Sequence, residues 1–173
     1  MNLKDYIASI PGFPKEGIMF RDVTPILNDP DAFEYTTKQL ADYAKKVGAT
    51  KVLGPEARGF IFGTPVSILN HIGFVPVRKP GKLPRKQLTE EYALEYGTNT
   101  LCIHEDALKK GDKVVIIDDL LATGGTALAA AHLAEKAGAE VVGMAFVVEL
   151  PDLKPREILK DYDVFSLVEY EGE

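Results

Sequence analysis

Two carboxylates and a turn of small residues adjoin each other in VVIIDDLLATGGT, residues 114–126. The apolar residues that open this stretch are typical of a buried strand, and Asp118 and Asp119 come at its carboxyl end. Ligands of open parallel α/β sheets bind beyond the carboxyl ends of the strands. The turn places glycines before a helix, where backbone N–H groups and the helix dipole favour phosphate. We therefore predict a phosphate site made of Ala122, Thr123, Gly124, Gly125 and Thr126.

The two acids need a different partner, because carboxylates do not bind phosphate. They accept hydrogen bonds from sugar hydroxyls, directly or through Mg²⁺, which prefers oxygen ligands. A phosphorylated ribose satisfies both halves of the stretch. The alternative is a plain strand–turn–helix junction in which Asp119 is a solvated cap. Neither G-x-x-x-x-G-K-[ST] nor G-x-G-x-x-G occurs, which disfavours a nucleoside triphosphatase and a dinucleotide oxidoreductase.

Basic residues gather after two other predicted strands, in a chain that is acidic as a whole. They are Arg58, Arg78, Lys79, Lys82, Arg85 and Lys86. The last five lie just before and at the start of a polar segment, residues 80–99, that we interpret as a long mobile loop, with a hairpin inside it as the alternative. Its position suits a lid that closes over an anion and excludes water. A solvated basic face is the other interpretation, and we assign Arg85 and Lys86 to it.

Strands and helices alternate along the chain and would position these residues. We expect a short N-terminal helix carrying Leu3, Ile7 and Ile10, and then an irregular arm. The next helix is predicted to be capped by Asp29 and to end at Gly48. Apolar residues nearly all round RGFIFGTPVSILNHIG predict a buried helix. KVLGPE, FVPVRK, VVGMAFVV and VFSLVEY read as further strands, so we predict an α/β fold with a mainly parallel sheet.

Composition limits the function classes. The 173 residues are expected to form one domain, and a net charge of −6 argues against nucleic-acid or membrane partners. The single cysteine, Cys102, excludes an internal disulfide and a cysteine-rich zinc site. His71, His104 and His132 lack metal-ligand spacing. No signal peptide or spanning segment is recognisable, so we expect a cytoplasmic protein.

The whole stretch at residues 114–126 resembles the ribose-phosphate signature of the type I phosphoribosyltransferases. FPKEGIMFRDVTPIL, RGFIFG, VRKPGKLP and YALEYG resemble the adenine phosphoribosyltransferases, in the same order and over nearly the whole chain. The resemblance implies a type I phosphoribosyltransferase fold with an N-terminal hood or arm (1–30) and a flexible lid loop (80–100). It also implies transfer of ribose 5-phosphate from 5-phospho-α-D-ribose 1-diphosphate to N9 of adenine, giving AMP and diphosphate. Mg²⁺ and a homodimer are expected on the same ground.

The resemblance assigns roles to single residues. Arg58 would lie in a diphosphate loop that often holds a non-proline cis peptide, and Arg78, Lys79 and Lys82 would bind diphosphate from the lid. Glu95 would be the acid–base residue, and Asp118 and Asp119 would hold the ribose, with Mg²⁺ carried mainly by substrate. The residues expected around adenine are Met19, Phe20, Arg21, Tyr96 and Leu150.

Two other functions stay open at this point. One is a phosphoribosyltransferase for a base other than adenine. The other is a non-enzymatic sensor of the sugar diphosphate, like the regulators of purine operons. Such regulators often add a DNA-binding segment, and a short arm and a net acidic chain do not favour one here.

Overall fold

A five-stranded parallel sheet forms the centre of the molecule. The computed structural model describes residues 1–94 and 97–172. The strands are β3 (Lys51–Pro55), β4 (Gly73–Val77), β7 (Lys113–Leu121), β8 (Glu140–Glu149) and β9 (Val164–Glu169). They lie in the order β4-β3-β7-β8-β9, and every neighbouring pair is parallel. The predicted α/β fold with a mainly parallel sheet is confirmed.

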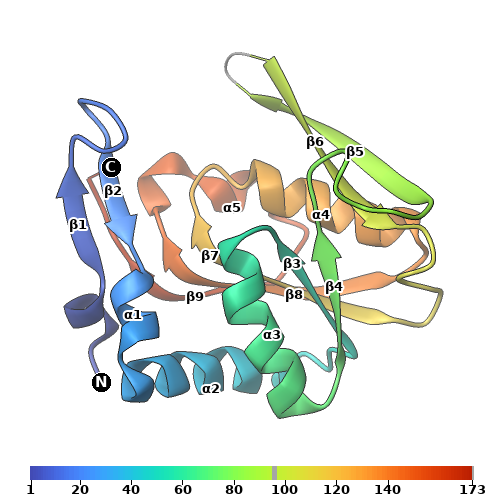
Figure 1. Cartoon of the computed structure of the whole chain (residues 1–173), viewed down its shortest axis with the longest axis horizontal. Coiled ribbons are helices and arrows are strands. Elements are labelled where there is room, and N and C mark those ends of the chain that lie inside the picture. Colours follow the sequence, from blue (N-terminus) through green and yellow to red (C-terminus); the bar gives the residue numbers. More distant parts are fainter. Residues whose placement is uncertain (95–96, 173) are drawn as a thin grey trace.

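Helices cover both faces of this sheet (Figure 1). On β7, Val115 and Ile117 join the buried cluster that holds α2 (Pro30–Lys46) and α3 (Arg58–Asn70). Val114 and Ile116 join the opposite cluster, which holds α4 (Gly125–Lys136). A strand buried on both faces needs apolar residues at every position, which explains the unbroken run before Asp118. The strand itself continues through both acids to Leu121.

The start of α2 follows the predicted capping chemistry. The Asp29 side chain accepts hydrogen bonds from the backbone N–H groups of Asp31 and Ala32, at 3.0 and 2.9 Å. Pro30 occupies the first turn, where a missing N–H costs nothing. Gly48 follows the helix with a φ of 78°, which suits glycine at a helix exit.

Helix α3 is less buried than its sequence predicts. Ile68 and Leu69 are 83% and 55% exposed, whereas Phe62 and Val66 are fully buried. The prediction of a helix buried all round is wrong, because one face of α3 packs on the sheet and α2 while no described residue covers Ile68 and Leu69 on the other. Within the described part of the chain, no helix has the length and apolar character needed to cross a bilayer.

The N-terminal segment is mostly extended. A 3-10 helix (Leu3–Tyr6) is followed by β1 (Ala8–Pro11), which pairs antiparallel with β2 (Met19–Asp22). The predicted helix is therefore wrong beyond Tyr6, and Ile10 pairs with Phe20 instead. Proline at position 11 lacks the N–H that a helix would need, which favours the strand. A short helix, α1 (Thr24–Asn28), then leads into α2.

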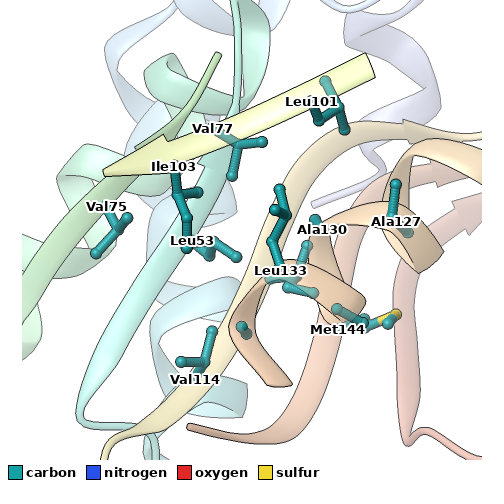
Figure 2. Packing of buried hydrophobic residues seen from close by; sticks show 14 of the residues in the cluster. Leu53, Val75, Val77, Leu101, Ile103, Val114, Ala127, Ala130, Leu133 and Met144 are labelled. Atoms are coloured by element: carbon teal, nitrogen blue, oxygen red, sulfur yellow. The ribbon is translucent and has the colours of Figure 1, made fainter. Parts of the chain in front are cut away.

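Most of the predicted lid is a hairpin anchored to the core. Its strands are β5 (Gln87–Leu94) and β6 (Gly97–His104), so the hairpin alternative is confirmed. Figure 2 shows Leu101 and Ile103 of β6 among the buried side chains next to α4. Arg78 and Cys102 exchange two backbone hydrogen bonds, at 2.9 and 2.8 Å. Between β8 and β9, the chain forms a 3-10 turn (Pro151–Leu153) and the short helix α5 (Pro155–Ile158).

Candidate active site

The loop between β7 and α4 has the backbone form that a phosphate cradle needs. Gly124 precedes α4 with a φ of 93°, a conformation that glycine adopts without strain. A Cβ atom at Gly124 would lie 3.1 Å from Cδ1 of Ile158, so α5 packs directly against the loop. The N–H groups of the first turn of α4 are free of intrahelical partners, as at any helix start, and favour an anion there.

A hollow of about 210 Å³ lies between this loop, the end of β7 and the start of α3. The predicted phosphate residues and three predicted charged residues line it together. The lining residues are Arg58, Asp118, Asp119, Leu120, Leu121, Ala122, Thr123, Gly124, Gly125, Thr126, Ala127 and Phe146. The sequence therefore identified the polar part of this hollow, and the structure adds its apolar floor.

Two of the three charged residues of the hollow are paired with each other. Arg58 Nε lies 2.5 Å from Asp119 Oδ2, and Asp119 is only 6% exposed. This hydrogen bond raises the pKa of Arg58, and the negative charges of Asp119, Asp118 and Asp22 act in the same direction. The interpretation of Asp119 as a solvated cap is wrong, because its carboxylate is buried against Arg58.

Asp118 is held differently from its neighbour. Its Oδ1 accepts a hydrogen bond from the backbone N–H of Asp119 at 2.8 Å. Burial raises the pKa of Asp118 well above its usual range, and the adjacent Asp119 charge adds to this rise. A Cβ atom at Gly59 would lie 3.1 Å from Asp118 Oδ1, so glycine lets the first turn of α3 approach the acids. A cationic or hydroxyl-bearing ligand would relieve the repulsion between the two carboxylates.

The segment before Arg58 contains a cis peptide bond between Glu56 and Ala57. The bond agrees with the cis peptide implied for this position. Glu56 Oε1 accepts hydrogen bonds from the backbone N–H of Lys79, at 2.9 Å, and from Arg78 Nε, at 3.1 Å. These bonds lower the pKa of Glu56. Pairing of Arg58 with Glu56, an alternative to an anion-binding role, does not occur.

The other predicted diphosphate residues lie outside the lining of the hollow. Arg78 is committed to Glu56 and lies over the Phe60 ring, with 5.9 Å between Cζ and the ring centroid. Lys79 and Lys82 are exposed. Arg85 forms an exposed ion pair with Asp106 at 2.6 Å, which agrees with its assignment to a solvated face.

The predicted adenine residues are not brought into the hollow either. Met19, Phe20 and Arg21 lie on β2. The Phe20 ring packs edge-on against Phe13 with 5.0 Å between centroids, and Arg21 lies 4.0 Å from the centroid of the Tyr170 ring. Leu150 is buried, and its backbone N–H bonds to the carbonyl of Leu121, which lines the hollow. Glu95 and Tyr96 lie outside the described residues.

Residues that contact or flank the lining of the hollow were not all singled out from the sequence. Tyr92 of β5 places its Oη 3.2 Å from Oγ1 of Thr126. Glu149, 2% exposed at the end of β8, is bound by Arg156 of α5 through two hydrogen bonds of 2.9 Å. For Tyr92, its spacing of two residues from Glu90 and of four from Leu88 was a signal that these side chains share one side of a strand. For Glu149, its place at the end of an apolar strand was a signal of a buried ion pair.

The acid pair is the part of the hollow that could contact a metal ion. Among residues 1–94 and 97–172, no three His, Cys, Asp or Glu side chains converge in a group that would hold a metal ion. Asp118 and Asp119 offer carboxylate oxygens to the hollow, and Asp119 already bonds Arg58. Oxygen donors of this kind fit Mg²⁺ when a substrate supplies the remaining ligands.

Comparisons with known proteins agree on one family. The model of the phosphoribosyl transferase domain matches residues 32–172. The adenine phosphoribosyltransferase of Alkaliphilus oremlandii is 55% identical over 171 residues, covering 99% of both chains. The crystal structure of adenine phosphoribosyltransferase from Thermoanaerobacter pseudethanolicus has a TM-score of 0.94 at 49% identity, covering 97% of this chain and 98% of that chain.

A ligand-bound relative adds chemical detail. The adenine phosphoribosyltransferase of Saccharomyces cerevisiae was crystallised with adenine and D-2,5-dideoxy-2,5-imino-altritol 1,6-bisphosphate. Its structure has a TM-score of 0.90 at 39% identity and covers 96% of this chain and 96% of that one. With a family model over most of its length and full-length relatives above half identity, the chain belongs to the phosphoribosyl transferase family, among the adenine phosphoribosyltransferases.

Proposed function

We propose that the protein transfers ribose 5-phosphate from 5-phospho-α-D-ribose 1-diphosphate to N9 of adenine, releasing diphosphate and AMP. One observation carries the chemistry: a single hollow is lined by Arg58, by the acid pair and by the small-residue loop before α4. A sugar phosphate that leaves a diphosphate needs all three kinds of group. Membership in the family gives the reaction class, and purine salvage is the matching role.

The 5-phosphate is assigned to residues 122–126. Backbone N–H groups before and within the first turn of α4, with the hydroxyls of Thr123 and Thr126, supply the donors. Asp118 and Asp119 are assigned to the ribose hydroxyls as acceptors. These groups are fixed by the strand and helix that carry them, so most of the rate acceleration would come from positioning and electrostatics.

Diphosphate is assigned to Arg58, with Arg78, Lys79 and Lys82. Arg58 donates to Asp119 through Nε, which orients the guanidinium and leaves the N–H groups of its two terminal nitrogens for charge-assisted bonds to diphosphate. Arg78 donates to Glu56 through Nε in the same way.

Mg²⁺ is the cofactor we propose, held mainly by the sugar diphosphate with Asp118 and Asp119 nearby. The support is the donor chemistry of the hollow, where two carboxylates stand together and the pKa of Asp118 is raised in part by Asp119. When bound, the ion would neutralise charge on the departing diphosphate. The chain itself would contribute the carboxylate oxygens of Asp118 and Asp119 and would exclude water from the hollow.

Adenine is assigned to Met19, Phe20 and Arg21 on β2, with Leu150 and Tyr96 completing the pocket. Phe20 would stack on the purine, and backbone groups of Met19 and Arg21 would read its exocyclic amine and N1. Glu95 is assigned as the acid–base group that moves the proton of the base. The bound adenine of the Saccharomyces cerevisiae enzyme supports a purine site in this fold.

We also propose that the protein is a cytoplasmic homodimer. The exposed apolar face of α3 supports association, because Ile68 and Leu69 border a groove of about 760 Å³ between α2 and α3. Large exposed apolar patches of this kind mark association surfaces. The single buried cysteine is compatible with a reducing compartment.

The experiment that tests the function is incubation with the sugar diphosphate, Mg²⁺ and one free base at a time. Adenine, hypoxanthine, guanine and orotate make up the panel, and nucleotide formation is followed by chromatography. We expect AMP from adenine and little product from the oxo-purines. Product from another base alone would replace adenine in the proposal, and binding of the sugar diphosphate without any nucleotide would identify a sensor.

A further inference from the structure

The hairpin β5–β6 presents one side of β5 to α4. Side chains at 88, 90 and 92 are partly buried, whereas those at 89, 91 and 93 are exposed. Glu90 forms an ion pair with Lys136 of α4 at 2.6 Å and a hydrogen bond with Nδ1 of His132 at 3.1 Å. Lys136 also donates to the carbonyl of Thr89 at 2.7 Å. These contacts fix the hairpin along the helix whose first turn closes the predicted phosphate site (Figure 1).

Tyr92 extends this contact to the phosphate loop itself. Its Oη lies 3.2 Å from Thr126 Oγ1, and Thr126 lines the hollow. A Cβ atom at Gly125 would lie 3.2 Å from Cδ2 of Tyr92, so glycine leaves the room that the ring occupies. Asn99 faces Tyr92 across the hairpin and donates from Nδ2 to Tyr92 Oη at 3.3 Å.

Either hydroxyl of the Tyr92–Thr126 pair could be the donor, and we assign the direction from the partner of Tyr92 on its other side. The amide nitrogen of Asn99 only donates, so it occupies an acceptor position on Tyr92 Oη. The phenol proton is then available to Thr126, whose hydroxyl accepts it with a lone pair. Thr126 has one hydroxyl proton, and once the hydroxyl accepts from Tyr92 that proton is left for a ligand in the hollow. Successive donors polarise one another, which strengthens the last bond.

We propose that Tyr92 and Asn99 are positioning residues that orient the Thr126 hydroxyl as a donor to the 5-phosphate. The inference rests on the proposed function, since it needs a phosphate on this loop. Both residues belong to the hairpin, so phosphate affinity depends on the packing of the hairpin against α4. By thermodynamic linkage, bound phosphate stabilises this packing by the same free energy.

The test is calorimetric binding of AMP and of adenosine to the wild type and to Tyr92→Phe. Phenylalanine keeps the ring against Gly125 and removes only the hydroxyl. We expect AMP to bind roughly five- to tenfold more weakly to the variant, the loss typical of one hydrogen bond. Adenosine, which lacks the phosphate, should bind both proteins equally. The matched control is Tyr162→Phe, which removes a phenol that bonds Glu135 at the other end of α4.

A double-mutant cycle separates orientation from packing. In a Thr126→Val background the hydroxyl that Tyr92 orients is gone, so Tyr92→Phe should cost less than twofold in AMP affinity. Equal losses in both backgrounds would overturn the proposal, as would a loss for adenosine matching that for AMP. Asn99→Leu gives a second reading and should weaken AMP binding in the same direction as Tyr92→Phe.

The outcomes also distinguish this inference from the function on which it rests. If the wild type binds AMP no better than adenosine, both the phosphate site and the role of Tyr92 and Asn99 are contradicted. If the wild type prefers AMP and Tyr92→Phe keeps that preference unchanged, the role of Tyr92 is contradicted and the proposed function is not.

Discussion

Arg58 and Asp119 neutralise each other in the free protein, although they are assigned to different parts of the substrate. The bond between Nε and Oδ2 leaves Asp118 as the acid without a cationic hydrogen-bond partner. Of the two acids, Asp118 is therefore the one whose charge is more costly in the absence of ligand. Sites that bind charged substrates often store such unfavourable charge, because the ligand relieves it on binding.

Replacement of Asp118 by asparagine should consequently stabilise the free protein while weakening ribose binding. The pKa of Asp118 is raised in the folded state, so folded protein binds more protons than unfolded protein above the usual aspartate pKa, about 3.9. Stability is then lost as pH rises through the folded-state pKa, by linkage. We expect Asp118→Asn to raise the Tm at pH 7 by roughly 2–4 °C, the shift that about 1 kcal/mol produces in a chain of this size.

Thermal melts at several pH values check this expectation. The gain from Asp118→Asn should shrink as the pH falls toward 4, because wild-type Asp118 is then neutral as well. Asp42→Asn, which alters an exposed acid of α2, is the control and should leave the Tm unchanged at both pH values. A gain that does not depend on pH would mean that charge on Asp118 is not its origin.

At the scale of elements, an ion pair between Arg156 and the buried Glu149 helps to hold α5 in place. Arg156 of α5 donates twice to Glu149, and Ser166 of β9 donates to the same carboxylate at 2.8 Å. The bonds from Arg156 lower the pKa of Glu149. Because α5 also packs on Gly124 through Ile158, the ion pair fixes one wall of the phosphate loop from behind.

Arg156→Met should therefore destabilise the fold by about 2 kcal/mol at pH 7. Removing one partner of a buried pair typically costs ~3–5 kcal/mol, and the half-exposed arginine reduces this. A depressed pKa gives stability above the usual glutamate pKa and loses it as pH falls, so the variant should differ least from wild type near pH 4. Urea unfolding at pH 7 and pH 4 measures the free energy of unfolding of the variant and the wild type. Equal losses of stability at the two pH values would contradict the ion-pair argument.

Sequence patterns predicted the elements where burial follows a regular period. The apolar runs of β7 and β8 reveal strands covered on both faces, and Asp29, Pro30 and Gly48 mark the ends of α2 because capping is local chemistry. The alternation along β5 indicates which side of the strand carries Tyr92, but it does not predict the contact of Tyr92 with Thr126, 34 residues away. The hollow's charged residues were predictable as types, but the pairing of Arg58 with Asp119 depends on how α3 meets β7.

At the scale of the whole molecule, the apolar face of α3 was the largest departure from expectation. Periodicity within one chain does not tell whether an apolar side chain meets the chain's own core or a second subunit. Ile68 is the most exposed large apolar residue of the described chain. A homodimer that covers this face would bury the apolar residues of α3, as its sequence predicts.

Ile68→Glu should accordingly shift the protein from dimer to monomer. A buried carboxylate without a partner is strongly unfavourable at an apolar interface. Analytical ultracentrifugation over a concentration series should show at least a tenfold weaker association, roughly 1.4 kcal/mol. Leu153→Glu, an exposed leucine outside α3, is the control and should leave the mass unchanged. A wild type that sediments as a monomer would contradict the homodimer itself.

The backbone bridge between Arg78 and Cys102 places the chain's one thiol inside the base of the hairpin. Burial raises the pKa of the Cys102 thiol, so at neutral pH it stays protonated and is a poor nucleophile. Oxidants and alkylating reagents would reach it only after β6 separates from β4. Two copies that meet on their surfaces cannot form a disulfide bond through this buried thiol. Changes in the redox potential of the surroundings should therefore not crosslink the protein.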